Sequence, residues 1–210
     1  MLLEIEAENK SPVADILVNE IKMKNTFILL IISGLITLLS PISSSAASDN
    51  PLLAAGFFHL KVKKTAPDFM LKDVENNLVC LKEFQGKTIL LFFWTTWWPS
   101  CRKEVPSLSK LYNEFKDKDF VVFGINVKES RQIVKKHIEK KKMTFPILLD
   151  FDGKVEKQYG VRGHPAHFLI NRQGEMIGKA LGERNWANAR NRNLIQFLLD
   201  QDWKSKNTAN

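Results

Sequence analysis

The stretch from Thr88 to Trp94 constrains the fold of this chain more than any other. It reads TILLFFW, an unbroken apolar run with no polar alternation. Such a run is typical of a strand covered on both faces, as in the middle of a parallel or mixed sheet. The sequence therefore predicts a buried central strand here.

A helix is predicted to begin at Pro99, shortly after this strand. Proline suits a first helical position, because its missing N–H is not needed there. Cys101 then lies in the first helical turn. Backbone N–H groups and a partial positive charge at a helix N-terminus lower the pKa of a thiol, so this layout predicts thiol chemistry.

Strands and helices alternate along most of the chain. A hairpin is expected before the central strand, with its turn at Asp73–Asn77 and its second strand at Leu78–Leu81. The elements expected after Pro99 are a helix with apolar residues from Val105 to Phe115, a buried strand at Asp119–Asn126, an amphipathic helix at Glu129–Lys141, a short strand at Phe145–Leu149, a hairpin turn at Gln173–Gly174, a strand at Glu175–Lys179 and a helix at Trp186–Trp203.

Three segments resemble one known family. Residues 94–106, WTTWWPSCRKEVP, are similar to the active-site segment of the extracytoplasmic TlpA/ResA-type thioredoxin-like proteins, which reads roughly F-W-A-T-W-C-P-P-C-R-x-E-x-P. Residues 66–69, APDF, match the family's entry segment, and 159–170 resemble its Y-G-V-x-G-x-P-x-x-F-L-I segment, in which the proline is cis. The resemblance covers Thr65 to about Asp202. It implies an α/β thioredoxin-like fold with a central mixed β-sheet flanked by helices and an N-terminal β-hairpin addition.

The chain departs from this pattern at one position. Trp98 stands where the family has its first, nucleophilic cysteine, and only Cys101 remains. Thiol–disulfide exchange needs one thiolate that attacks and a second thiol that resolves the mixed disulfide. We therefore expect impaired dithiol reductase activity. Trp98 is either a selected change or a lesion.

The resemblance also implies a function and its partners. Family members reduce periplasmic disulfides, for instance during cytochrome c maturation, so the expected partners are protein or peptide thiols and disulfides, with a membrane redox donor and no cofactor. An alternative is a non-catalytic module that holds extended peptides at the same surface. A third interpretation is a monothiol that traps partners through Cys101.

Six residues form the expected site. Cys101 and Glu104 are the candidate catalytic residues, because Glu104 matches a glutamate that influences the cysteines in the ResA branch; a surface position in the second helical turn is the alternative. The substrate-binding candidates are Trp98, Pro99, His164 and Pro165. His164 is expected to face the site, with a half-exposed loop histidine as the alternative.

Neither a metal site nor a second redox pair is indicated by the remaining residues. Cys101, His164 and His167 lack a usual ligand spacing and a fourth ligand, so no metal is expected. Cys80 is the only other cysteine, and strand alternation places it opposite Val79 as a half-exposed residue. A relocated redox pair would require Cys80 to lie close to Cys101.

The N-terminal residues 1–47 are predicted to hold a signal peptide. Phe27–Leu39 is apolar, follows lysines and precedes a run of small residues that ends at Ala47. The acidic residues before Met23 suit a signal poorly, so the true start is expected at Met23. An uncleaved anchor is the alternative. We expect a linker at 48–64, the thioredoxin-like domain at 65–203 and a tail at 204–210.

The charge balance is basic. The chain carries a net charge of +8, and the part after residue 47 holds 28 basic and 18 acidic residues. No nucleic-acid motif concentrates this charge, so a solvated basic surface is expected. The predicted protein is extracytoplasmic (periplasmic) and monomeric.

Overall fold

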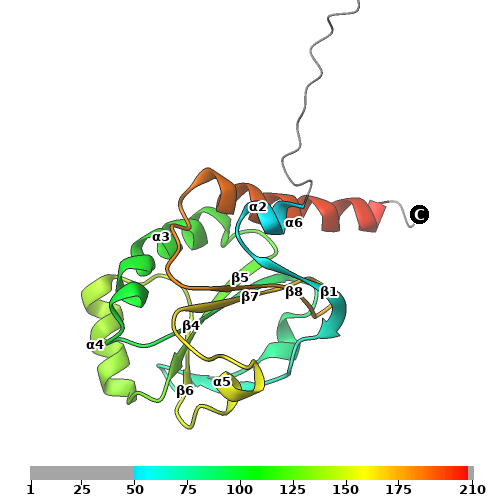
Figure 1. The fold of residues 1–210 in the computed structure, drawn as a ribbon. Helices are drawn as coiled ribbons and strands as arrows, with labels where there is room; N and C mark the ends of the chain where they lie inside the picture. Colours follow the sequence, from blue (N-terminus) through cyan, green and yellow to red (C-terminus); the bar gives the residue numbers. More distant parts are fainter. Residues whose placement is uncertain (1–49, 208–210) are drawn as a thin grey trace, which may run out of the picture. The chain divides into compact units, whose positions relative to one another are not determined.

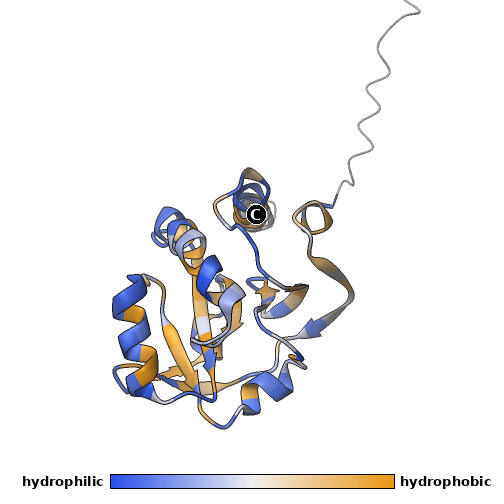
Figure 2. Cartoon of the chain, turned by 60° about the vertical axis from the view of Figure 1, so that its left-hand side comes forward, coloured by the Kyte–Doolittle hydropathy of each residue, from blue (hydrophilic) through white to orange (hydrophobic). Residues whose placement is uncertain are grey.

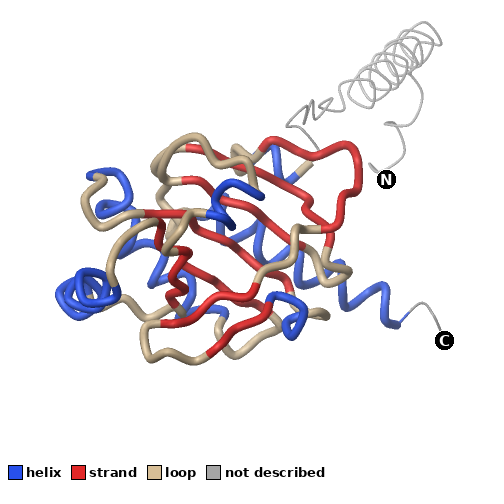
Figure 3. The backbone as a smooth tube through the Cα atoms, turned by 90° about the horizontal axis from the view of Figure 1, so that it is seen from below, coloured by secondary structure: helices blue, strands red, loops and turns tan. Residues whose placement is uncertain are grey.

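The structure, a computed structural model, describes residues 50–207. Its strands form one eight-stranded sheet in the order β1-β8-β7-β4-β5-β6-β2-β3, seen side by side in Figure 3. The strands are β1 Phe58–Thr65, β2 Met70–Asp73, β3 Leu78–Cys80, β4 Thr88–Trp94, β5 Phe120–Val127, β6 Ile147–Asp150, β7 Ala166–Ile170 and β8 Glu175–Leu181. The helices are α2 Pro51–Ala54, η1 Leu81–Phe84, α3 Pro99–Phe115, α4 Arg131–Lys141, α5 Lys154–Gln158 and α6 Ala189–Asn207.

Strand β4 lies in the middle of this sheet, as its apolar sequence predicts. Every one of its residues is buried. It pairs parallel with β5 on one side and antiparallel with β7 on the other, so the sheet is mixed. Both faces of β4 need apolar side chains because both are covered.

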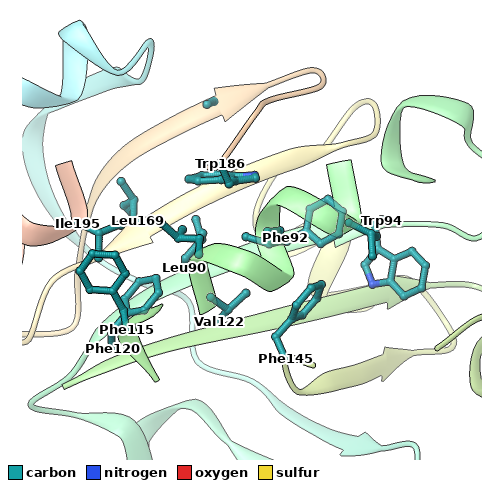
Figure 4. Packing of buried hydrophobic residues seen from close by; sticks show 14 of the residues in the cluster. Leu90, Phe92, Trp94, Phe115, Phe120, Val122, Phe145, Leu169, Trp186 and Ile195 are labelled. Carbon is teal, nitrogen blue, oxygen red and sulfur yellow. The ribbon is translucent and has the colours of Figure 1, made fainter. Parts of the chain in front are cut away.

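The two faces of the sheet carry separate hydrophobic clusters. Leu90, Phe92 and Trp94 pack with residues of α2, α3, α4 and α6, and Figure 4 shows them among aromatic rings that include Trp186. Leu91 and Phe93 point the other way and pack beneath η1 and α5. In Figure 1 α3 and α6 lie above the sheet and α5 below it, and Figure 2 shows the hydrophobic strands between largely hydrophilic helices.

The predicted hairpin is confirmed. Strands β2 and β3 pair antiparallel, and β2 also pairs with β6, so the hairpin extends one edge of the sheet. Asp73 stabilises the turn by accepting hydrogen bonds from the amides of Glu75 and Asn77, at 2.9 and 2.8 Å.

The expected linker at 48–64 is wrong from Pro51 onward. Residues Pro51–Ala54 form helix α2, and β1 extends the other edge of the sheet by pairing with β8. Phe57 between them is only 2 % exposed. The sequence FHLKVKKT alternates apolar and polar residues up to Lys63, which is the pattern of a strand rather than of a linker.

Two further boundaries differ from the prediction. Helix α6 begins at Ala189, so Trp186 lies in the loop before it, and the helix continues to Asn207, beyond the expected domain end at 203. No helix within residues 50–207 is long and apolar enough to cross a bilayer. The predicted signal segment at Phe27–Leu39 lies outside the described residues.

Candidate functional site

The junction between β4 and α3 forms the centre of the site. Trp98 is the N-cap of α3 and Pro99 its first helical residue, as predicted. The Trp98 carbonyl accepts the first helical hydrogen bond, from the Arg102 amide at 3.3 Å. The half-buried Trp98 side chain packs against the hydrophobic cluster beneath α3. An indole therefore lies at the N-terminal end of the helix whose first turn carries Cys101.

Cys101 does not have the lowered pKa that its position predicts. Its side chain is 0 % exposed. Burial raises the pKa of the thiol to about 12, and the charges of Glu104 and Glu129 act in the same direction, whereas the Thr95 backbone amide opposes them. Desolvation disfavours the thiolate more than the backbone hydrogen bonds favour it. The remaining thiol is therefore protonated at neutral pH.

Glu104 is buried rather than exposed on the helix surface, with 1 % of its area accessible. Its Oε1 lies 2.5 Å from His167 Nε2 and also accepts a hydrogen bond from Trp186 Nε1. Its Oε2 accepts a hydrogen bond from the Arg184 backbone amide at 3.3 Å. Three donors thus satisfy a carboxylate that would otherwise be costly to bury. We name these four residues the Glu104 cluster.

Arg184 connects this cluster to the N-terminal segment. Its guanidinium donates hydrogen bonds to the carbonyls of Ala55 and Gly56. It also lies over the rings of Phe57 and Trp186, at 4.6 and 5.6 Å from their centroids. One residue therefore links α2, the loop before α6 and the active-site helix.

A second carboxylate holds the loop between β4 and α3. Glu129 accepts hydrogen bonds from the Thr96 amide and hydroxyl, at 2.6 and 2.5 Å, and from Asn126 Nδ2 at 2.7 Å. No sequence motif identifies Glu129 or the partners of Glu104 as site residues. One sequence feature does point to Glu129: it lies two residues after the buried strand β5. Because β5 runs parallel to β4, its carboxyl end lies beside the loop that follows β4.

The expected substrate-binding residues do come together. The Trp98 ring lies 6.2 Å from that of His164, and the His164–Pro165 peptide bond is cis. His164 is mostly buried, with Nε2 3.1 Å from Glu156 Oε1. Burial lowers its pKa, while Glu156 acts against this shift. Trp97 is 59 % exposed and packs on Trp98 with ring centroids 5.0 Å apart.

Cys80 does not form a relocated redox pair with Cys101. Both cysteines are free. Cys80 ends β3 at the sheet edge, four strand spacings from β4, or about 19 Å at the usual spacing. Within residues 50–207 no three His, Cys, Asp or Glu side chains are grouped to hold a metal ion.

Comparisons with known proteins agree with this fold. The AhpC/TSA family matches residues 62–178. The thiol–disulfide oxidoreductase ResA of Bacillus thuringiensis is 34 % identical over 125 residues, covering 60 % of this chain and 72 % of the relative.

Solved structures show the same architecture. The thioredoxin domain of a thiol–disulfide oxidoreductase from Bacteroides vulgatus is 31 % identical, with a TM-score of 0.59 and coverage of 67 % of this chain and 99 % of that domain. StoA from Bacillus subtilis is 27 % identical, with a TM-score of 0.54 and coverage of 61 % and 97 %. The predicted thioredoxin-like α/β fold is confirmed.

Proposed function

Because the chain belongs to the AhpC/TSA family and, within it, to the ResA-type thiol–disulfide oxidoreductases, we propose that it is an exported member of this class with impaired dithiol exchange. The observation that carries the impairment is Trp98 at the N-cap of α3, the position of the attacking cysteine in the family pattern. The partners proposed are disulfide-containing polypeptides, as for the class.

The chemistry of exchange explains the impairment. A dithiol reductase attacks a substrate disulfide with one thiolate and releases the substrate thiols when its second thiol displaces the mixed disulfide. Trp98 has no sulfur to attack with. Cys101 is fully buried, with a pKa of about 12, so it is a poor substitute. This also weakens the monothiol interpretation.

An insulin-reduction assay with dithiothreitol tests the proposal. We expect turnover near background for the natural sequence and recovery in Trp98→Cys, since the helix start is in place and the His164 loop lies beside position 98. The matched control is Trp98→Cys combined with Cys101→Ser, which lacks the resolving thiol and should fall back. Robust turnover by the natural sequence would contradict the impairment.

Export is the other part of the proposal. It is supported by the apolar segment Phe27–Leu39, the lysines before it and the small residues up to Ala47. Expression in a bacterial host followed by cell fractionation and intact-mass measurement tests it. We expect a periplasmic product whose first residue follows Ala47, or a membrane-bound product if the segment is retained. A full-length cytoplasmic product would contradict export.

A peptide-binding module is the second candidate function. It is favoured by the 59 % exposure of Trp97 beside Trp98, because large exposed aromatic residues are enriched at binding sites. Residues 162–164 also make no backbone hydrogen bond within the described part of the chain, which leaves a main-chain edge for an extended peptide. Pull-down with the protein and with Trp98→Ala tests this function, and identical partner sets would remove its basis.

A further inference from the structure

The indole of Trp97 is exposed to solvent and is supported from below by other side chains. It is 59 % exposed, yet it stacks on Trp98, which is packed into the core cluster beneath α3. The loop that carries both residues is held by the hydrogen bonds of Thr96 to Glu129. A rigid, exposed indole loses little conformational entropy when a ligand covers it, and such residues are typical binding hot spots.

Two exposed arginines in the segments that carry Trp97 and His164 lack a carboxylate partner among the described residues. Arg102 is exposed and donates a hydrogen bond to the Trp97 carbonyl at 3.1 Å, which places its guanidinium beside the Trp97 backbone. Arg162 is exposed two residues before His164, about 7 Å along an extended chain, and the His164 ring contacts Trp98. Neither arginine forms an ion pair with any described residue.

The carboxylates of this region are already occupied. Glu104 is buried among three N–H donors, and Glu129 binds Thr96 and Asn126. Glu156 lies between Lys128 and His164. Glu183 is exposed and lies 3.9 Å from Lys103, another cation of the same helical turn as Arg102. The charge presented to solvent beside Trp97 is therefore positive.

From these observations we propose that Trp97, Trp98, Arg102 and Arg162 form a docking surface for an acidic, extended polypeptide segment. The indoles would cover an apolar residue of the segment, the two arginines would pair with carboxylates on either side of it, and the free backbone of residues 162–164 would pair with its main chain. Charge complementarity fixes the kind of partner, because a basic segment would place like charges against both arginines. This inference rests on the peptide-binding function and adds its ligand class.

Three synthetic peptides test the proposal against the purified full chain. Each holds the same central Leu-Pro-Phe, flanked by Asp and Glu, by Ser and Gln, or by Lys and Arg. Fluorescence anisotropy at low salt should show the acidic peptide binding at least about tenfold more tightly than the basic one. Its affinity should fall as salt is added, because exposed charges are screened.

Variants locate the site. Trp97→Ala should weaken binding of the acidic peptide about tenfold or more. Arg102→Glu combined with Arg162→Glu should remove or reverse the preference for acidic over basic peptides. The matched control is Lys116→Glu, an exposed residue just beyond α3, about 25 Å from its start by helix geometry. It changes the net charge without touching the site, so the preference should persist.

The possible outcomes distinguish a failure of the acidic preference from a failure of the peptide-binding function. Peptide binding that depends on Trp97 but not on peptide charge would overturn the acidic preference and leave the binding function standing. Absence of binding by all three peptides, or binding unaffected by Trp97→Ala and by both arginine reversals, would overturn the docking surface itself.

Discussion

Opposing influences act on the thiol of Cys101 within one helical turn. The first turn of α3 offers amide groups and a positive partial charge, which favour a thiolate. The side chain, however, points into the core and is 0 % exposed, so the charged form loses its hydration. Burial raises the pKa of the thiol to about 12 and outweighs the backbone hydrogen bonds that favour the thiolate.

Alkylation of the folded protein measures this balance. At pH 8 we expect the thiolate fraction of Cys101 to be about 1,000-fold below that of an ordinary thiol, from its pKa alone. Iodoacetamide should therefore modify Cys80, which is half-buried, well before Cys101. Peptide mapping by mass spectrometry distinguishes the two sites. Urea should abolish the difference, and equal rates in the folded protein would contradict the buried thiol.

His164 gives a residue-scale prediction about pH. Its folded-state pKa is lowered by burial, so as pH falls below about 6.5 the unfolded chain takes up a proton before the native state does. Stability should thus decline on acidification below this pH and recover above it, with a slope from this residue below about 1.4 kcal/mol per pH unit.

Urea unfolding at pH 7.5 and pH 5.5 measures this slope. His164→Gln should reduce the difference between the two midpoints. His137 shares the direction, because burial lowers its pKa as well, so His137→Gln should reduce it further. An unchanged difference in the double variant would rule out these imidazoles as its source.

At the scale of elements, side-chain hydrogen bonds connect the segment that contains α2 to helix α3. Arg184 binds the carbonyls of Ala55 and Gly56, while its own amide binds Glu104 on α3. The sheet contributes as well, since β1 pairs with β8. Helix α2, with four residues, is too short to be stable alone and depends on these tertiary contacts.

Arg184→Met is expected to loosen α2 and the start of β1 without unfolding the core. The loss of hydrogen bonds from a partly buried cation should cost about 1.5–3 kcal/mol. Hydrogen exchange should accelerate at residues 52–58 more than in β4. Arg190→Met is the matched control, because Arg190 is exposed on α6 and no ion pair holds it among the described residues. Uniform acceleration across the sheet would contradict a local fastening.

For the whole molecule, the two faces of one sheet bury different parts of the chain. The cluster between the sheet and helices α3 and α6 includes Leu52, Ala55 and Phe57 from the N-terminal segment. These residues precede Thr65, where the sequence suggests that the domain begins. A chain that starts there would expose this part of the cluster and the edge of β8.

Two truncations test this view of the domain. A chain that starts at Ser48 should retain the stability of the fold. A chain that starts at Thr65 should lose about 3 kcal/mol or more, because it cannot bury Leu52 and Phe57. Urea unfolding of both compares them directly. Equal midpoints would mean that α2 and β1 add nothing to stability.

The fold was largely predictable because its strongest signals are local. The apolar run Thr88–Trp94 identified the central strand, and Pro99 identified the helix start. The hairpin before the central strand followed from turn residues and alternation. Strand β1 was missed, although it alternates, because it follows an apolar stretch that was assigned to a linker.

The candidate site was only partly predictable. The motifs placed Trp98, His164 and Pro165 together correctly, since the family pattern encodes that neighbourhood. They left open whether Glu104 was buried and gave no sign that His167, Trp186 and Arg184 surround it. These residues are 63 to 82 positions away along the chain, so no local spacing relates them.

The sequence by itself determined the class of fold and the absence of a sulfur atom at position 98, because both follow from short runs of contiguous residues. The tertiary structure decided what the remaining groups are able to do. Hydration, partner donors and neighbouring charges set the state of a thiol or a carboxylate, and these come from segments that meet only when the sheet has formed. For that reason the Cys101 thiol is buried with a raised pKa and the Glu104 carboxylate has hydrogen-bond partners, whereas Trp97 remains exposed to solvent.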